Sequence, residues 1–319
     1  MKYLITGGMG FLGSHLAEEL LKRGNEVTCL DLFEEKRCTH FRDWETYRLV
    51  IDTILNKPLV TQLVRSADAV IHLAAIAEPQ QYVQLPRKTI EVNLKASLAI
   101  LEEVTATNKL FFFSSTSEIY GKNTVQPFRE DSDRILGSTD INRWCYSSAK
   151  AMVEHYINAL HQEQLLEFVG IRIFNCYGPR LKGRVVSKFI DQVQSGKPIV
   201  IHGEGAQQRC FTYVSDLVNG IISLIETKSS HGSFYNIGNP KEEYSVKQLA
   251  QVVSEQLNQE NYPITHVDRA AYGPSYQDLD RRVPSIDKIS KAINWSPTVS
   301  LQEGISKMIE YNNTFGNNS

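Results

Sequence analysis

The sequence predicts an α/β protein in which a doubly wound parallel sheet is joined to a smaller C-terminal α/β domain. Three observations indicate this fold class. Short apolar runs alternate with segments of helical period, a Gly-rich turn separates the first two runs, and the pattern loosens after about residue 175. Strands that are apolar along their whole length are buried on both faces, as in parallel sheets covered by crossover helices.

Five apolar runs are predicted to form strands of this sheet, and they cover residues 3–6, 26–30, 69–73, 110–113 and 168–173. Between the first two runs, Leu12, Leu16 and Leu20 recur at helical spacing, and Gly24 ends the helix. The chain therefore opens with a β-α-β unit.

Later segments divide between the two domains. The helical pattern of 214–225 and the strand pattern of 233–237 are predicted to return to the first sheet, whereas a helix over 246–257 belongs to the C-terminal portion. We predict a first, Rossmann-type domain of residues 1–174 with 210–239, and a second domain of residues 175–209 and 240–319.

The composition excludes several classes of function. With 319 residues, 42% hydrophobic content and a formal net charge of -2, the chain can build a large core and lacks a basic surface for nucleic acid. Five cysteines without C-x-x-C spacing predict reduced thiols rather than a disulfide framework or a zinc site. No apolar run approaches the about 20 residues of a membrane span. We therefore expect a cytoplasmic protein without a metal, a nucleic-acid partner or a membrane anchor.

A glycine turn predicts a dinucleotide site. Gly7, Gly10 and Gly13 follow the first predicted strand and open the first predicted helix. In this context the glycines permit a tight turn, and backbone amides at the helix start, at Phe11 and Leu12, can approach a pyrophosphate. The alternative is a glycine-rich turn without a ligand.

Two aspartates follow later strands of the same sheet. Asp31 ends the second strand, where its carboxylate can accept from ribose hydroxyls and would repel a 2'-phosphate, so NAD is favoured over NADP. The nearby Arg37 leaves NADP open. Asp52 follows the run 49–51 and could meet the adenine amine, although a solvated aspartate at a strand end is an equal alternative.

A further contact with the cofactor is predicted where the strand at 69–73 ends. Leu73, Ala74 and Ala75 are small or apolar and suit close passage of the cofactor, whereas His72 is predicted to be structural.

Tyr146 and Lys150 predict the chemistry. They form the only Tyr-x-x-x-Lys pair among fourteen tyrosines, and on a helix both side chains share one face. Because an ordinary tyrosine pKa is about 10, a tyrosine base needs a neighbouring positive charge, which a lysine ammonium can supply. The pair also follows a strand that ends in Ser114-Ser-Thr-Ser-Glu118. The alternative is an amphipathic helix with an incidental lysine.

Several motifs in the same order resemble those of the extended short-chain dehydrogenases/reductases, and specifically the NAD-dependent nucleotide-sugar epimerase/dehydratase group. The resemblance covers nearly the whole chain and implies tightly bound NAD, oxidation of a sugar at C4 and return of the hydride after an intermediate step. The motifs are the glycine turn, His72-Leu-Ala-Ala, 114–121, Tyr-x-x-x-Lys, Arg172-Ile-Phe-Asn-Cys-Tyr-Gly-Pro-Arg180, 203–216 and Trp295-Ser-Pro.

Within that group the chain looks most like the UDP-glucuronate decarboxylases. The motifs concerned are 116–118, Pro79-x-x-Tyr82, Arg143-Trp-x-Tyr-Ser, Gly183-Arg-Val-Val-Ser and Arg282-Val-Pro-Ser-Ile286. The resemblance implies that Tyr146 is the base, that Lys150 tunes it and that Thr116 bonds near O4. It also implies that Ser117 and Glu118 address the C5/C6 side, while Arg282 orients the carboxylate or protonates C5.

Three other functions stay open. A C4-epimerase acting on the same uronate or on a UDP-hexose uses the same Tyr, Lys and Thr, but such enzymes usually place a small residue where Glu118 stands. A 4,6-dehydratase would want an acid where Ser117 stands. A non-catalytic NAD-sensing protein could keep the fold and lose the chemistry, although Tyr146, Lys150 and Thr116 are all present.

The resemblance also implies substrate and partner contacts. Arg209 would pair with a UDP diphosphate, and Arg281 competes with Arg282 for the pocket. Tyr213 and Asp216 are expected to be structural. A homodimer is expected through helices near 93–103 and 149–160. The remaining residues implied to touch substrate or cofactor are Pro79, Tyr82, Asn93, Asn175, Arg184, Val185, Val186 and Lys188.

Overall fold

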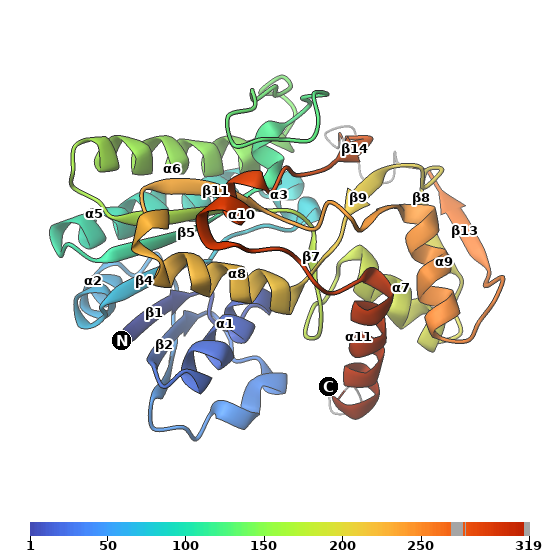
Figure 1. The fold of residues 1–319 in the computed structure, drawn as a ribbon, viewed down its shortest axis with the longest axis horizontal. Coiled ribbons are helices and arrows are strands. Elements are labelled where there is room, and N and C mark those ends of the chain that lie inside the picture. Colours follow the sequence, from blue (N-terminus) through green and yellow to red (C-terminus); the bar gives the residue numbers. More distant parts are fainter. Residues whose placement is uncertain (269–276, 278, 316–319) are drawn as a thin grey trace.

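A seven-stranded, all-parallel sheet forms the centre of the computed structural model, which describes residues 1–268, 277 and 279–315 (Figure 1). Its strand order is β11-β6-β5-β4-β1-β2-β3. The strands are β1 (Lys2–Thr6), β2 (Glu26–Asp31), β3 (Tyr47–Ile51), β4 (Ala69–His72), β5 (Leu110–Thr116), β6 (Phe168–Ile173) and β11 (Ser233–Ile237). The predicted Rossmann-type fold class is confirmed.

Helices cover both faces of this sheet, and each face has its own apolar core. On β1, Tyr3 and Ile5 face the core beneath α1 (Phe11–Lys22) and α8 (Val214–Glu226). Leu4 faces the core beneath α2 (Lys57–Ser66), α5 (Ser97–Ala106) and α6 (Trp144–Gln162). Because alternate side chains of a strand point to opposite faces, a strand between two helical layers must be apolar throughout. This explains why the strand runs read as continuous apolar segments.

The remaining helices around the sheet connect its strands. They are η1 (Lys36–Phe41), α2 (Lys57–Ser66), α3 (Pro79–Gln84), α4 (Pro86–Ile90), η2 (Glu91–Ala96), α5 (Ser97–Ala106), η3 (Ser117–Tyr120), α6 (Trp144–Gln162) and η4 (Lys228–Ser230). Across the described residues, no helix combines the length and apolar character needed to cross a bilayer.

A smaller portion packs beside the carboxyl ends of the strands, on the right in Figure 1. There α7 packs on α9, and α9 on α11. Its elements are β7 (Cys176–Tyr177), α7 (Val185–Gln194), β8 (Ile199–His202), β9 (Gln208–Cys210), β10 (Thr212–Tyr213), β12 (Glu243–Ser245), α9 (Val246–Gln256), β13 (Ile264–Val267), β14 (Arg281–Arg282) and α11 (Leu301–Phe315). Three short sheets, β10-β7, β12-β9-β14 and β13-β8, connect these elements.

The segments expected to return to the first sheet do so. β11 pairs with β6 in parallel, and α8 packs on α1. In addition, α10 (Asp287–Ile293) packs against β11 and α8. The division of the chain into two domains at the residues named above stays a prediction.

Candidate active site

The glycine turn between β1 and α1 has the geometry that a pyrophosphate needs. Gly7 has φ of +73°, and a Cβ placed on it would lie 2.8 Å from Ala74 N. A Cβ on Gly13 would lie 2.1 Å from Gly7 O, whereas one on Gly10 would meet only that same oxygen at 3.2 Å. Gly7 and Gly13 are therefore required for close packing of the turn, and Gly10 leaves open the space before the N-terminus of α1.

The two aspartates lie at adjacent strand ends. Asp31 accepts from Met9 N at 2.9 Å and from Leu32 N at 2.7 Å, so its carboxylate is fixed beside the turn. Burial raises the pKa of Asp31, and these hydrogen bonds act against that rise. Asp52 accepts from Thr53 N at 2.6 Å and from Asn56 Nδ2 at 2.9 Å, which are contacts of a local turn. The side chain of Arg37 lies outside the described part of the chain.

His72 is structural, as predicted. It is completely buried, with Nδ1 at 2.6 Å from Thr6 Oγ1 and Nε2 at 2.8 Å from Ser97 Oγ. Burial lowers the pKa of His72 to about 3, so the ring is neutral at physiological pH.

The segment after β4 is held by Asn93. Its side-chain amide accepts from Ile76 N at 2.8 Å and donates to Ile76 O at 2.9 Å. Leu73 N donates to Thr6 O, which places Leu73, Ala74 and Ala75 beside the glycine turn. Asn93 therefore supports the segment that is predicted to meet the cofactor, and its own contact with the cofactor stays a prediction.

Tyr146 and Lys150 project from the first turns of α6 toward the end of β5. Lys150 is 1% exposed, and its Nζ donates to Ser114 O at 2.8 Å and lies 4.6 Å from the centre of the Phe113 ring. Burial lowers the pKa of Lys150 to about 7, against the effect of Glu154, which raises it.

Tyr146 is protonated at neutral pH in this structure. Burial raises its pKa to about 12, and negative Glu118 adds to the rise, while a hydrogen bond with Thr116 and positive Arg184 act in the opposite direction. Its ring stacks on that of Tyr82 with centroids 4.9 Å apart. A base at this position therefore needs further positive charge from a ligand.

A buried ion-pair cluster lies next to this pair. Glu118 accepts from Arg143 Nη2 at 2.9 Å and from Arg282 Nη1 at 2.7 Å. Arg143 Nη1 also donates to the hydroxyl of Tyr82 at 3.0 Å, so the cluster continues to the ring that stacks on Tyr146. Burial acts to raise the pKa of Glu118, but the two guanidinium groups outweigh it and lower that pKa to about 2.

The pairing of β14 in its sheet determines which of the two consecutive arginines faces Glu118. Arg282 is buried and faces Glu118, whereas Arg281 is exposed and pairs with Glu243 at 2.6 Å. They point to opposite sides because successive residues of a strand do so.

Arg143 is the functional candidate to which the sequence reasoning assigned no role. It precedes Tyr146 by three residues at the start of α6, so the two side chains share one helix face. That spacing is the signal that could have identified it.

Two other expected contacts lie close to this cluster. Ser117 is buried in the first turn of η3. Thr116 caps this turn, because its Oγ1 accepts from Glu118 N at 3.2 Å. Pro79 begins α3, the helix that carries Tyr82.

The expected substrate anchors come from the smaller portion. Arg184 caps the start of α7 and donates from Nη2 to Ala77 O at 2.9 Å, which brings it to the segment after β4. Val185 is the first residue of α7 and is half-buried, Val186 is buried, and Lys188 is exposed. Lys188 is therefore the least enclosed of these residues.

The side chains of Asn175 and Arg209 differ in how far their hydrogen-bond donors are already used. The Nδ2 of Asn175 is buried and has no hydrogen-bond partner among the described residues, which leaves a donor available to a ligand. Arg209 instead donates to Gln208 O and Leu279 O, both at 2.7 Å, and so holds the chain before β14.

Tyr213 and Asp216 have the structural roles that were expected. Tyr213 is buried at the end of β10. Asp216 accepts from Thr298 N and Val299 N, both at 3.0 Å, and thus anchors the segment after Trp295 to α8.

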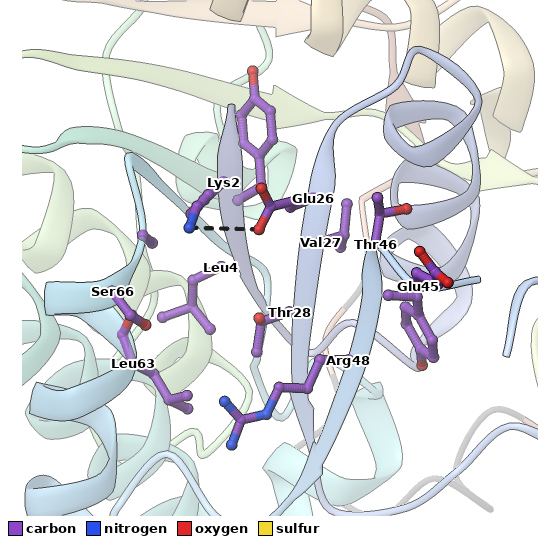
Figure 2. Close-up of a pocket in the computed structure, with 13 residues that line it drawn as sticks. Lys2, Leu4, Glu26, Val27, Thr28, Glu45, Thr46, Arg48, Leu63 and Ser66 are labelled. Atoms are coloured by element: carbon purple, nitrogen blue, oxygen red, sulfur yellow. Dashed lines mark hydrogen bonds and ion pairs between the residues drawn. The ribbon is translucent and has the colours of Figure 1, made fainter. Parts of the chain in front are cut away.

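A separate cavity of about 270 Å³ lies at the amino ends of β1, β2 and β3 (Figure 2). Lys2 and Glu26, which line it, form an ion pair at 3.6 Å, with Arg48 and Leu63 below them in this view. The glycine turn and Tyr146 lie at the opposite, carboxyl edge of the sheet, so this cavity is not part of the candidate active site. The described residues contain no group of three or more His, Cys, Asp or Glu that could hold a metal ion.

The glycine turn, the fixed carboxylate of Asp31 and the Tyr-Lys pair at the carboxyl edge of a Rossmann sheet together fit a nicotinamide dinucleotide. A family model for the NAD dependent epimerase/dehydratase family matches residues 3–238. The chain belongs to this family, so it is an enzyme and NAD is its cofactor.

Similar proteins narrow the range of reactions. The UDP-N-acetyl-alpha-D-glucosaminuronate decarboxylase of Bacillus cytotoxicus is 36% identical over 314 residues, which cover 97% of this chain and 96% of that protein. UDP-glucuronic acid decarboxylase 1 of Xenopus tropicalis is 36% identical over 318 residues, covering 97% of this chain and 72% of that protein. A structure of the UDP-glucuronic acid 4-epimerase of Bacillus cereus with UDP-glucuronic acid and NAD matches with a TM-score of 0.88 at 27% identity, covering 98% of this chain and 99% of that chain.

Proposed function

We propose that this enzyme oxidises C4 of a UDP-hexuronate, in the first place UDP-glucuronate, and then removes its carboxylate to give UDP-xylose or the 4-keto pentose. The observation that supports this most strongly is the ion-pair cluster of Glu118 with Arg143 and Arg282 beside Tyr146. Oxidation at C4 does not need such a cluster. A substrate that carries a carboxylate on C5 does need cationic N–H donors there.

Tyr146 takes the proton from the 4-hydroxyl group in the first step. NAD, when bound, supplies a positively charged ring and the acceptor for the hydride that leaves C4. Thr116 hydrogen-bonds with the Tyr146 hydroxyl and is in place to hold O4. Lys150 lies one helical turn further on, so its ammonium group favours the phenolate form of Tyr146.

The C4 ketone makes the substrate a β-keto acid. When the C5–C6 bond breaks, its electron pair moves into the enolate of C4 and C5, carbon dioxide leaves, and a proton from solvent on C5 gives the 4-keto pentose. UDP-xylose would follow if the hydride returned from the reduced cofactor to C4 while Tyr146 returned its proton to O4; release of the 4-keto pentose would instead leave the cofactor reduced. Arg282 holds the carboxylate in the alignment that this cleavage needs, and Glu118 fixes the guanidinium groups of Arg282 and Arg143. With a pKa of about 2, Glu118 serves in this scheme as a carboxylate and not as a proton donor.

The UDP moiety would be bound by Asn175, Arg184, Val185, Lys188 and Arg209. The support for this assignment is the Nδ2 of Asn175, which has no partner in the part of the chain that the structure describes, and the position of Arg184 between α7 and the segment after β4. The similar proteins leave the substituent on C2 of the sugar open. One relative is named for UDP-N-acetyl-alpha-D-glucosaminuronate, and another is named for UDP-glucuronic acid.

C4-epimerisation of the same substrate is the alternative, and the match to the Bacillus cereus epimerase supports it. In that case Glu118 and Arg282 would hold the carboxylate out of the alignment needed for its loss. We also propose a cytoplasmic homodimer, for which the exposed Met152 and Tyr156 on α6 and the five free cysteines give support.

Arg282→Ala tests the two-step scheme, and Arg281→Ala is the matched control one residue away. In a single turnover with UDP-glucuronate, Arg282→Ala should still reduce the bound NAD but should stall before a pentose appears. Arg281→Ala should behave like the unchanged protein, because that side chain pairs with Glu243 at the surface. Equal loss of NAD reduction and of pentose formation in Arg282→Ala would contradict separate roles for Tyr146 and Arg282.

A further inference from the structure

A buried ion pair one helical turn beyond Lys150 takes no part in the steps above. Glu154 follows Lys150 by four residues on α6, and its carboxylate accepts from Arg172 Nη2 at 2.6 Å and from Arg172 Nε at 3.2 Å. The two side chains are only 6% and 11% exposed. Burying two charges costs desolvation that their attraction often only offsets, so stability alone is a weak reason for such a pair.

The pair ties α6 to two strands at once. Ser115 on β5 and Arg172 on β6 are direct neighbours in the sheet register, and both donate to Glu154. Arg172 Nη1 also reaches the hydroxyl of Tyr120 at 2.9 Å in η3, the turn that begins with Ser117 and Glu118. One carboxylate therefore connects the helix of the Tyr-Lys pair to the strand and turn that face it.

Three successive residues of β5 each meet one residue of α6. Ser114 O accepts from Lys150, Ser115 Oγ donates to Glu154, and Thr116 bonds with Tyr146. The three partners on α6 are spaced by four residues, so all of them lie on one helix face. A slide of α6 along β5 would break all three contacts together.

We infer that Glu154 is a positioning residue of the reaction: held by Ser115 and Arg172, it fixes the register of α6 on β5 and keeps a negative charge beside the Lys150 ammonium group. This inference rests on the roles of Tyr146 and Lys150 proposed above. Glu154 is not expected to touch substrate or cofactor, because Lys150 and Tyr146 lie between it and the start of α6.

Apart from Tyr146, whose interaction with Lys150 is part of the function proposed above, two titratable groups in the described part of the chain interact electrostatically with Lys150. They are Glu154 on the same helix and His72 on β4. His72 is neutral, since burial lowers its pKa to about 3. The other close neighbours of Lys150 Nζ, Ser114 O and the Phe113 ring, carry no charge. Glu154 is therefore the charge that favours the ammonium form.

Removing the Glu154 charge has a predictable effect on Tyr146. Burial already lowers the pKa of Lys150 to about 7, so without the Glu154 charge fewer molecules carry the ammonium charge at neutral pH, and it is this charge that favours the phenolate form of Tyr146 in the proposed reaction. Ionisation of Tyr146 moves to higher pH as a result. A purely structural ion pair would not have this effect.

The test uses the NAD-bound protein without substrate. Tyrosinate absorbance is followed against pH, and subtraction of the same protein carrying Tyr146→Phe isolates the signal of Tyr146. Glu154→Gln should raise the midpoint by about one pH unit or more. Arg172→Lys keeps both charges of the pair and a donor to Glu154, so it should move the midpoint by much less than Glu154→Gln does, and both variants should lower the unfolding temperature.

An unchanged midpoint in Glu154→Gln overturns the inference, as does an equal rise in Arg172→Lys. If Glu154→Gln does not fold, Glu154→Gln with Arg172→Gln replaces it, because this double variant leaves no unpaired buried charge; it should show the same rise, and an unchanged midpoint again overturns the inference. Failure of the proposed function is distinguishable, since it would appear as normal turnover in Tyr146→Phe.

Discussion

Replacing Glu118 by Gln should destabilise the protein, and more so at neutral than at acid pH. The side chain is 16% exposed and accepts from two buried guanidinium groups, at 2.9 Å from Arg143 and 2.7 Å from Arg282. Its pKa falls from 4.5 to about 2 despite burial, which acts to raise it. At about 1.4 kcal/mol per pH unit, this depression corresponds to about 3 kcal/mol of folding free energy.

The pH window follows from the sign of this shift. Because the pKa is lower in the folded than in the unfolded protein, the contribution of Glu118 is complete well above pH 4.5 and is lost as the pH falls toward 2. Glu118→Gln should therefore cost about 3 kcal/mol at pH 7, and about 1 kcal/mol less than that at pH 4.

Urea unfolding of the unchanged protein and the variant, at pH 7 and at pH 4, measures both quantities. Glu243→Gln is the matched control, because Glu243 pairs with the neighbouring Arg281 at 2.6 Å but at the surface. It should cost less than about 1 kcal/mol at either pH. Equal costs for the two variants, or a Glu118→Gln cost that does not depend on pH, would refute the reasoning about the buried cluster.

Three further predictions concern the cofactor and the substrate. Asp31→Ala should narrow the preference for NAD over NADP in a cofactor titration, because the carboxylate that repels a 2'-phosphate is gone; stronger binding of NADP by the unchanged protein would remove Asp31 from this role. Tyr146→Phe should retain NAD and lose about 10²-fold or more in turnover, and a near-normal rate would place the base elsewhere. Arg209→Ala should weaken nucleotide-sugar binding by about 1.5–3 kcal/mol in calorimetry without changing NAD affinity; unchanged sugar affinity would limit Arg209 to holding the chain at Leu279.

The central sheet and the glycine turn at its carboxyl edge could be predicted because the sequence patterns that indicate them are local. Apolar runs between helical segments mark strands buried on both faces, and the glycines mark a turn whose backbone packs closely between β1 and α1. The apolar run of β5 covers only 110–113, and Ser114-Ser-Thr-Ser-Glu118 was expected to end this strand. The strand runs to Thr116, since its polar last residues are hydrogen-bonded in the sheet with β6, and η3 begins at Ser117. Periodicity does not detect a strand end that turns polar.

The arrangement around Glu118 could not be predicted in full, because tertiary pairing decides it. Arg281 and Arg282 are identical residues on a two-residue strand, and only the register of β14 on β9 determines which one is buried. The apolar pattern of α6 is likewise ambiguous. By helical spacing Met152, Val153, Tyr156 and Ile157 lie on one side of the helix, but Met152 and Tyr156 are exposed whereas Val153 and Ile157 are buried. The spacing of apolar residues shows which side of a helix is apolar, but not which of those residues pack against the core.

Product analysis after incubation with UDP-glucuronate, and in parallel with UDP-N-acetylglucosaminuronate, tests the central claim most directly. Mass spectrometry and NMR identify the nucleotide sugar, and trapping measures carbon dioxide, with Tyr146→Phe as the inactive control. The account predicts that at least one of the two substrates gives a UDP-pentose and one equivalent of carbon dioxide. An isobaric 4-epimer formed without carbon dioxide would contradict it.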